Sequence, residues 1–439
     1  MLRLEPDGPD LWDIALPPGL RKMSEELSRV GALLKDPRIM EPFLKNFNQT
    51  RGRATVPVST YLRLMYLKFR HKLGYETLVE EVSDSISWRA FCGISYQQSV
   101  PDSTTLIKLT HKYGEQTLQD LHTLILENLK GRKIVRGRKV RMDTTVVAAD
   151  IHYPTDTSLL HDGLKRLKRG LAKVGGLGLR LGRTVKTIKS MIFDIALTLR
   201  KRSPVSARKV RRLNYKALGL ARRAMSKVRE VLGRVEDQKV RNHLETTLAV
   251  TEKAAAQSRE RLSGEIPKDR IVSIADPEAR PIIKGKLDKP VEFGRIASLV
   301  QDESGYFTQG DVHLGNPQEA PLMPDILAAH EEQFPGALKA VAADTGYSSA
   351  DNHALMRSKG VMKIGVRWRG HAPPNIEAKQ RRPWFKSLYR FRAGIEAGIR
   401  FLDRKFGMKR SMFRGTAGTK MWVSWCVIAA NLYRFGRGP

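Results

Sequence analysis

Cysteine is scarce in this chain of 439 residues, which contains only Cys92 and Cys426, both in apolar surroundings. Two isolated thiols cannot build a disulfide scaffold, so they predict reduced core residues and a cytoplasmic protein. No Cys-x-x-Cys or Cys/His spacing of the kind that binds zinc is present. The composition therefore excludes a disulfide-rich secreted domain and a zinc-binding module.

Long apolar runs are also missing. The most apolar window, Trp422 to Tyr433, covers 12 residues, whereas a membrane-spanning helix needs about 20. The first 20 residues are Pro-rich and mildly acidic, without the basic and apolar regions of a signal peptide. We expect a loosely structured leader there and no membrane partner.

Acidic residues are few relative to basic ones: 45 Asp and Glu against 78 Lys and Arg give a net charge of +33. Such a field attracts polyanions, and nucleic acid is the commonest polyanion in a cell. The excess is concentrated in residues 163–229, which contain 21 Lys and Arg but a single acid, Asp194. The charge predicts a DNA-binding protein with a strongly basic segment.

The length predicts roughly two or three domains, and the first of them has a helical pattern. Residues 58–75 and 75–91 carry apolar stripes at helical spacing. Pro101-Asp102-Ser103-Thr104 is typical of a helix cap and precedes a helix that reaches about Leu129. These helices fit either a helix-turn-helix DNA reader or a helical bundle.

A buried strand is predicted at residues 139–151. Lys139 and Arg141 alternate with apolar residues, and a β-branched, small-residue run follows. Asp143 stands inside this run, where a carboxylate costs several kcal/mol unless a cation meets it. A metal ion is the usual cation. The alternatives are that Asp143 faces solvent at a strand end or pairs with Arg141.

A basic helical insertion follows this strand, since the strand pattern resumes only at Ile271. We expect a helical hairpin or a small bundle at 163–270. After it, strands and helices alternate as in an α/β fold with a mixed sheet. The predicted domains are a helical N-terminal domain at 1–134, a catalytic domain at 135–162 and 271–439, and the insertion. The predicted elements after the insertion are strands 291–300, 306–314, 338–343 and 361–366 and helices 323–333, 351–359, 387–406 and 419–432.

Two further carboxylates occupy suggestive positions. Asp344 follows the predicted strand 338–343, at the strand end where α/β sites collect. Glu396 lies in Ala393-Gly394-Ile395-Glu396-Ala397-Gly398, where small residues would let the helix approach a sheet closely. Three converging carboxylates on a basic protein suggest two divalent metals acting on phosphodiesters. The alternatives are a turn cap for Asp344 and an i,i+4 ion pair of Glu396 with Arg400.

An ordered set of motifs makes the chain resemble a known family, the DDE transposases of bacterial insertion sequences, over residues from about 55 to 435. The motifs are Met142-Asp143-Thr144-Thr145-Val146-Val147, Tyr153-Pro154-Thr155-Asp156-Thr157-Ser158-Leu159-Leu160, Gly315-Asn316-Pro317, Ala343-Asp344-Thr345-Gly346-Tyr347 and Tyr389-Arg390-Phe391-Arg392-Ala393-Gly394-Ile395-Glu396.

The resemblance implies an RNase H-like mixed-sheet core joined to an all-helical N-terminal domain and a helical insertion. It also implies that Asp143, Asp344 and Glu396 hold two Mg²⁺ ions, for which Mn²⁺ can substitute. Such an enzyme nicks transposon ends by metal-activated hydrolysis and joins the 3′-OH to target DNA. Double-stranded DNA is then the partner, bound by a homodimer.

The family signature around the third acid is Tyr, two residues, Arg, three residues, Glu, six residues, Lys. Tyr389, Arg392 and Glu396 fit it, and the resemblance implies that Tyr389 and Arg392 contact DNA. The Lys position holds Asp403, so Arg404 or Lys405 would have to contact DNA in its place. Two other functions stay open: an RNase H-like nuclease without strand transfer, and a basic architectural DNA-binding protein without catalysis.

Overall fold

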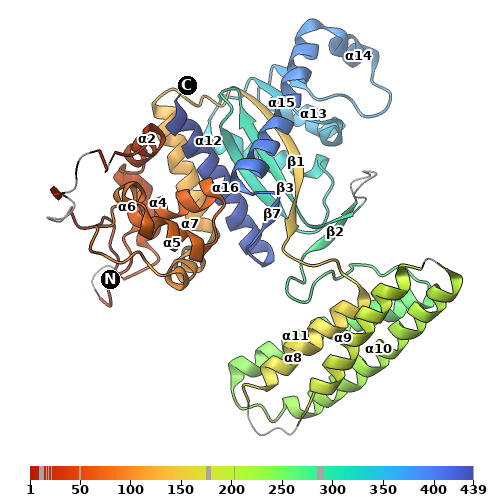
Figure 1. Ribbon diagram of the computed structural model, residues 1–439. Helices are drawn as coiled ribbons and strands as arrows, with labels where there is room; N and C mark the ends of the chain where they lie inside the picture. Colours follow the sequence, from red (N-terminus) through yellow and green to blue (C-terminus); the bar gives the residue numbers. More distant parts are fainter. Residues whose placement is uncertain are drawn as a thin grey trace. The chain divides into compact units, whose positions relative to one another are not determined.

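The computed structural model divides the chain into two compact units (Figure 1). Unit 1 contains Met1–Ala148 and Arg295–Pro439, and unit 2 contains Ala149–Gly294. The structure describes residues 1–8, 14, 15, 17, 19, 20, 22–48, 51–174, 179–201, 203–283 and 291–438. Of the predicted leader at 1–20, residues 9–13, 16 and 18 lie outside the described residues.

A mixed sheet of seven strands is built around β1, as the α/β pattern predicts. The order is β2-β3-β1-β5-β6, with β4 added to β3 and β7 to β1. β1 runs parallel to β5, β5 parallel to β6, and β3 antiparallel to both β2 and β4. The strands are β1 Lys139–Ala149, β2 Arg280–Ile283, β3 Val291–Asp302, β4 Phe307–His313, β5 Ala340–Ala342, β6 Lys363–Gly365 and β7 Arg410–Ser411.

The strand predictions agree with this sheet in their main features. The hairpin of β3 and β4 is confirmed, while β5 and β6 are shorter than their apolar runs suggest. The short strands β2 and β7 were not predicted, because four and two residues are too few to show alternation. Along β1, Val140 and Met142 are buried, which confirms the predicted inner face.

The N-terminal part of unit 1 is helical, as predicted. Asp102 caps α7, because its carboxylate accepts a hydrogen bond from the Thr104 N–H at 2.8 Å. The apolar stripe at 75–91 is divided between two helices, because Ser85 ends α5 and caps α6 through the Trp88 N–H. The elements are α2 Glu25–Leu33, η1 Pro37–Met40, α3 Glu41–Leu44, α4 Val58–His71, α5 Tyr75–Asp84, α6 Ile86–Cys92 and α7 Ser103–Gly131.

The apolar C-terminal helix α16, Gly415–Arg437, joins the N-terminal helices to the sheet in one core. Trp425 is 1% exposed, and its ring lies 5.9 Å from that of Phe69 on α4. On the sheet side, Asn431 accepts a hydrogen bond from the Phe307 N–H of β4 at 2.9 Å. No helix in the described ranges is long and apolar enough to cross a bilayer.

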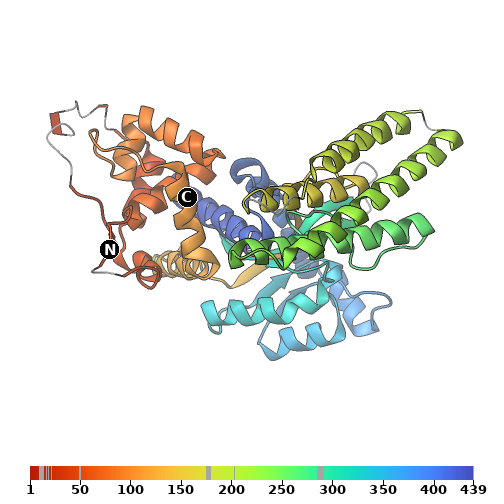
Figure 2. The same cartoon turned by 90° about the horizontal axis from the view of Figure 1, so that it is seen from below.

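Unit 2 contains a bundle of four long helices that run side by side (Figures 1 and 2). The helices are α8 Asp156–Leu171, α9 Gly182–Leu199, α10 Pro204–Leu232 and α11 Gln238–Ser263. A capping box of Thr155 and Ser158 starts α8. Of the two arrangements that the sequence left open for the insertion, the structure contains the bundle.

Four further helices complete unit 1: α12 Met323–Gln333, α13 Ala350–Ser358, α14 Pro374–Arg381 and α15 Pro383–Phe406. The 3-10 turns η2 Ala320–Leu322 and η3 Thr345–Tyr347 precede α12 and α13. The helix predicted at 323–333 has these same bounds. The helix α15 begins four residues before its predicted start and carries Glu396 across the sheet.

The bundle supplies a test of its packing at Gly163 of α8. A Cβ atom there would lie 2.3 Å from the Thr251 hydroxyl oxygen and 2.4 Å from the Thr251 methyl. Gly163→Ala should therefore lower the free energy of unfolding by about 1–3 kcal/mol, as overpacked cores do. Urea unfolding followed by far-UV circular dichroism measures the change.

The matched control is Gly219→Ala on α10, where an added Cβ meets nothing within 4 Å. There the better helix propensity of alanine should stabilise by up to about 1 kcal/mol. Equal effects of the two substitutions would contradict the close packing of α8 on α11.

Candidate active site

Asp143 lies near the middle of β1 and is 17% exposed at its side chain. Its Oδ1 accepts a hydrogen bond from the Thr144 N–H at 2.8 Å. Arg141 does not pair with it, because the Arg141 guanidinium donates to Gln301 Oε1 at 2.6 and 2.9 Å and to the Phe391 carbonyl. Asp143 is therefore half-buried within the strand, and the neighbouring arginine is not its partner.

Asp344 stands just beyond the carboxyl end of β5, which pairs in parallel with the first residues of β1. Its Oδ1 accepts a hydrogen bond from the Thr345 N–H at 2.8 Å, so it caps the short helix η3. The turn-cap alternative is thus correct for this oxygen. The Asp344 side chain is 47% exposed, so part of its carboxylate is open to solvent.

Glu396 is carried by α15, which approaches the sheet through glycines. A Cβ at Gly394 would lie 1.8 Å from an Arg141 nitrogen, and one at Gly398 would lie 3.0 Å from Gln301 Oε1. These contacts confirm that the small residues admit a close approach of helix and sheet. They leave the Glu396 side chain 53% exposed, at the side of α15 that carries Arg392.

Arg392 brings the three acids together. Its Nη1 lies 3.8 Å from Asp143 Oδ2 and 3.9 Å from Asp344 Oδ1, while its Nη2 lies 3.7 Å from Glu396 Oε1. The side chain is 14% exposed, and its buried Nε has no hydrogen-bond partner among the described residues. One guanidinium therefore serves three carboxylates at distances longer than hydrogen bonds.

The cluster holds more negative charge than one guanidinium can neutralise. The pKa of Asp143 is raised to about 6, mainly by burial and also by the nearby carboxylates of Glu319 and Asp344, although the Thr144 N–H and Arg392 lower it. Among the described residues, no three Asp, Glu, His or Cys side chains are drawn together tightly enough to hold a metal ion. The carboxylate oxygens and the surplus negative charge nevertheless fit a hard divalent cation.

Around the acids lie both predicted and unpredicted residues. The Tyr389 ring contacts two guanidinium groups, Arg392 at 5.3 Å and Arg367 at 4.3 Å. Arg367 was not predicted, because it lies outside every motif. Arg404 and Lys405 are exposed in the last turn of α15. No ion pair described by the structure joins either of them to the acid cluster.

Glu319 is the acid that the sequence did not single out. Its Oε1 accepts a hydrogen bond from the Thr144 hydroxyl at 2.7 Å, and the side chain is half-buried. Tyr347 beside it is fully buried, and its hydroxyl has no partner within the described part of the chain. Burial raises the Tyr347 pKa, and Glu319, Asp143 and Asp344 raise it further. The signal was the Gly315-Asn316-Pro317 motif just before Glu319.

Comparisons with known proteins agree with this geometry. Residues 19–112 match the transposase domain family DUF772, and residues 283–432 match the transposase DDE domain family. The chain belongs to the insertion-sequence DDE transposases. It is also 30% identical over 161 residues to the uncharacterized protein ORF8 in the nfe locus of Rhizobium meliloti. The matched segment covers 36% of the transposase and 77% of that relative. No solved structure matches.

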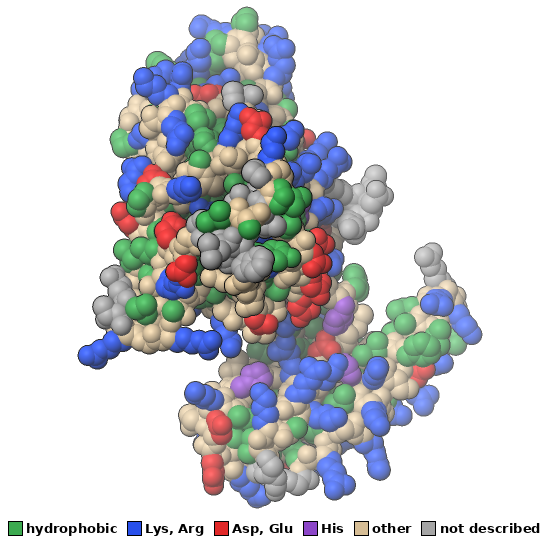
Figure 3. Space-filling model, turned by 60° about the vertical axis from the view of Figure 1, so that its left-hand side comes forward, with side chains coloured by type: hydrophobic (Ala, Val, Ile, Leu, Met, Phe, Trp, Pro, Cys, Tyr) green, Lys and Arg blue, Asp and Glu red, His purple; other side chains and the backbone are tan. Residues whose placement is uncertain are grey.

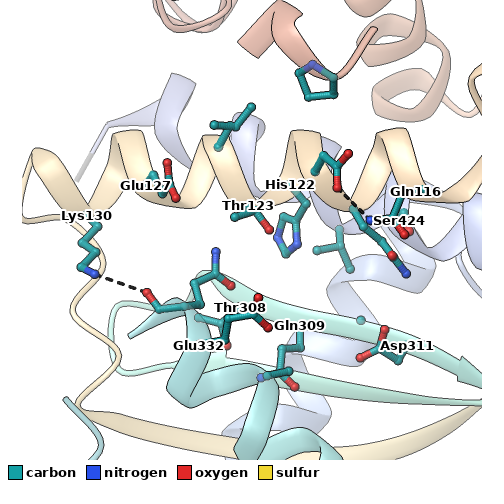
Figure 4. Close-up of a pocket in the computed structure, with 18 of the residues that line it drawn as sticks. Gln116, His122, Thr123, Glu127, Lys130, Thr308, Gln309, Asp311, Glu332 and Ser424 are labelled. Carbon is teal, nitrogen blue, oxygen red and sulfur yellow. Dashed lines mark hydrogen bonds between the residues drawn. The ribbon is translucent and has the colours of Figure 1, made fainter. Parts of the chain in front are cut away.

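The DDE match contains Asp344 and Glu396 but begins after most of unit 2, so Asp143 lies outside it. Geometry links Asp143 to the other two acids, because all three lie within 4 Å of the Arg392 guanidinium. The transposase also contains a cavity of about 960 Å³ elsewhere in unit 1, between α7, β4 and α12 (Figure 4). Its lining includes His122, Thr308 and Glu332 but none of these acids.

The role of the Arg392 guanidinium in holding the acids together can be tested without DNA. Arg392→Gln leaves three carboxylates without their common cation, so the metal-free protein should lose stability. We expect about 1–2 kcal/mol, less than the roughly 3–5 kcal/mol of a broken buried pair, because two of the acids are about half exposed. Melting in EDTA measures the loss, and added Mg²⁺ should reverse most of it.

Arg390→Gln is the control, since Arg390 is exposed on the same helix. It should leave the melting temperature nearly unchanged in both buffers. If Arg392→Gln has the same melting temperature as the parent protein in EDTA, the guanidinium does not hold the acids together.

Proposed function

We propose that this transposase nicks the ends of its element by hydrolysis and joins the freed 3′-OH to target DNA. The observation that carries the proposal is the convergence of Asp143, Asp344 and Glu396 on Arg392 at 3.7–3.9 Å. The acids come from a strand, a strand end and a helix, so the fold alone brings them together. An architectural DNA-binding protein has no need of such a cluster.

The three carboxylates are proposed to hold divalent cations, Mg²⁺ or Mn²⁺, through their oxygens. Bound cations would supply Lewis acidity toward the scissile phosphate and lower the pKa of the attacking hydroxyl. Asp143 is oriented by the Thr144 N–H and Asp344 by the Thr345 N–H, so each keeps one oxygen for a cation. The attacking groups are water and a 3′-OH, so no side chain of the transposase has to become a nucleophile.

Arg392 has two roles in this proposal. It neutralises the acids before substrate and cations arrive, and it then turns its planar fork toward a phosphate of the DNA strand. The Tyr389 ring contacts both Arg392 and Arg367 and would help to orient them. Arg404 and Lys405, exposed at the end of the same helix, would contact the DNA backbone farther along.

The basic bundle of unit 2 is proposed to bind DNA through phosphates. Figure 3 shows Lys and Arg side chains spread over its visible face. Helix α10 alone exposes Arg208, Lys209, Arg212 and Lys216 without an acidic residue in its first 26 positions. Phosphates are the partner that such a surface fits best.

The domain plan belongs to the same proposal. The helical N-terminal domain at 1–134 would bind transposon ends and support a homodimer on double-stranded DNA. The catalytic domain at 135–162 and 271–439 would be RNase H-like, and the insertion at 163–270 would add DNA affinity. The order β3-β1-β5-β6, with the first acid on β1 and the second after its parallel neighbour β5, supports this assignment.

Asp344→Ala should abolish Mg²⁺-dependent cleavage of a transposon-end duplex, while binding of that duplex in Ca²⁺ persists. The reason is that Asp344 would hold a cation, whereas DNA affinity arises from basic surfaces elsewhere. Denaturing gels measure nicking, and a gel shift in Ca²⁺ measures binding. Asp351→Ala on α13 is the matched control, since it removes an exposed acid of the same region.

Normal cleavage by Asp344→Ala would refute the catalytic assignment. Cleavage by the parent protein without joining of paired ends to a target plasmid would instead identify a nuclease without strand transfer.

The phosphate-binding role of the bundle predicts a salt effect. Changing Arg208, Lys209, Arg212 and Lys216 to Gln should reduce the slope of log K against log salt by about 3–4, near 0.9 per lost contact. Fluorescence anisotropy with a duplex at several salt concentrations measures the slope.

The control changes four basic residues that are already paired with acids. These are Arg229 with Glu252, Arg241 with Glu245, Lys253 with Asp269 and Arg261 with Asp156. Their substitution should alter the slope much less. A quadruple variant of α10 with the parent slope would show that its surface does not touch DNA.

A further inference from the structure

Glu319 reaches Asp143 through a single residue. Its carboxylate accepts the Thr144 hydroxyl at 2.7 Å, while the Thr144 N–H donates to Asp143 Oδ1 at 2.8 Å. Thr144 therefore uses both of its donors to join two acids. Because a hydrogen bond to a carboxylate is stronger than one between neutral groups, Glu319 limits the freedom of the strand beside Asp143.

The same carboxylate also touches the turn that follows Asp344. A Cβ at Gly346 would lie 1.8 Å from Glu319 Oε2 and 2.9 Å from its Cδ. Gly346 does not have the left-handed backbone that usually requires glycine. The space filled by the Glu319 side chain therefore accounts for the glycine, and Glu319 lies between the two backbone segments that carry Asp143 and Asp344.

Packing alone does not explain a carboxylate at this place. No Lys or Arg in the described ranges pairs with Glu319, and its neighbours include two other acids. Unused donors remain nearby, since Tyr347 Oη and Arg392 Nε are buried without a partner among the described residues. A half-buried acid among other acids lowers the stability of the fold. This favours a functional role for Glu319 over a purely structural one.

We propose that Glu319 is a positioning residue of the acid centre, which sets the place of Asp143 through Thr144 and the distance of the Asp344 turn through Gly346. Its own carboxylate orients the residues that bind the cations. The inference rests on the proposed function, because it concerns the same acids. Outer partners of metal ligands typically change metal affinity by about 10–100-fold when removed.

The test measures Mn²⁺ binding to the full chain without DNA, by electron paramagnetic resonance. Glu319→Ala should weaken binding about tenfold or more, and Thr144→Val, which removes only the hydroxyl, should weaken it similarly. The double variant should bind Mn²⁺ as Glu319→Ala does, because Thr144→Val removes a link that Glu319→Ala has already broken. Glu319→Gln, which keeps an acceptor for Thr144, should retain most of the affinity.

Gly346→Ala tests the same link while the charge of Glu319 remains. The new Cβ displaces the Glu319 carboxylate, so Mn²⁺ binding should weaken in the parent chain but not further in Glu319→Ala. Glu332→Ala, which removes an exposed acid from α12, is the control for lost negative charge and should leave the affinity unchanged. Far-UV circular dichroism verifies that each variant folds. If Glu319→Ala does not fold, the Mn²⁺ affinity of Thr144→Val tests the proposal instead.

Two failures are distinguishable. If Asp143→Ala weakens Mn²⁺ binding while Glu319→Ala and Thr144→Val bind as the parent does, Glu319 has no positioning role and the acid centre stands. If the parent chain binds no Mn²⁺, or Asp143→Ala binds it equally well, the metal centre itself is refuted together with the inference. Additive losses in the Glu319 and Thr144 variants would show that the two residues act separately.

Discussion

The close approach of α15 to the sheet is the constraint on which the acid site depends. Gly394 and Gly398 leave no side chain between the helix and the pair formed by Arg141 and Gln301. Any larger residue at Gly394 would occupy the place of the Arg141 guanidinium and push the helix outward. Only at this short separation can Glu396, two residues from each of these glycines, share a cation with an acid that lies inside a strand.

Arg141 and Arg392 show how position decides the role of an arginine. Arg141 is occupied by Gln301 and the Phe391 carbonyl, so it supports the helix and leaves Asp143 free. Arg392 makes only long ion pairs and keeps a donor unused. Arg141 is therefore fixed by hydrogen bonds. Other cations can replace Arg392 beside the acids with the loss of few hydrogen bonds.

Much of the fold was predictable because local signals determine it. The alternation along β1, the Asp102 cap of α7 and the turn between β3 and β4 are each encoded within a few residues. The three acids were also recognisable, from their places in predicted elements. The sequence predicted Arg392 as a DNA contact but not as the centre of the acids, because its approach to Asp143 depends on tertiary packing. Glu319 could not be assigned, since its partner Thr144 is 175 residues away.

The place of the inserted unit has a consequence for how this chain can vary. Unit 2 begins at Ala149, the last residue of β1, and ends at Gly294 within β3, and it contains β2, which pairs with β3. The helices α8 to α11 thus lie in the connection between β1 and β2, and the entropy of closing such a connection grows only slowly with its length. A change in the length of this segment therefore need not change the register among the strands that carry the acids.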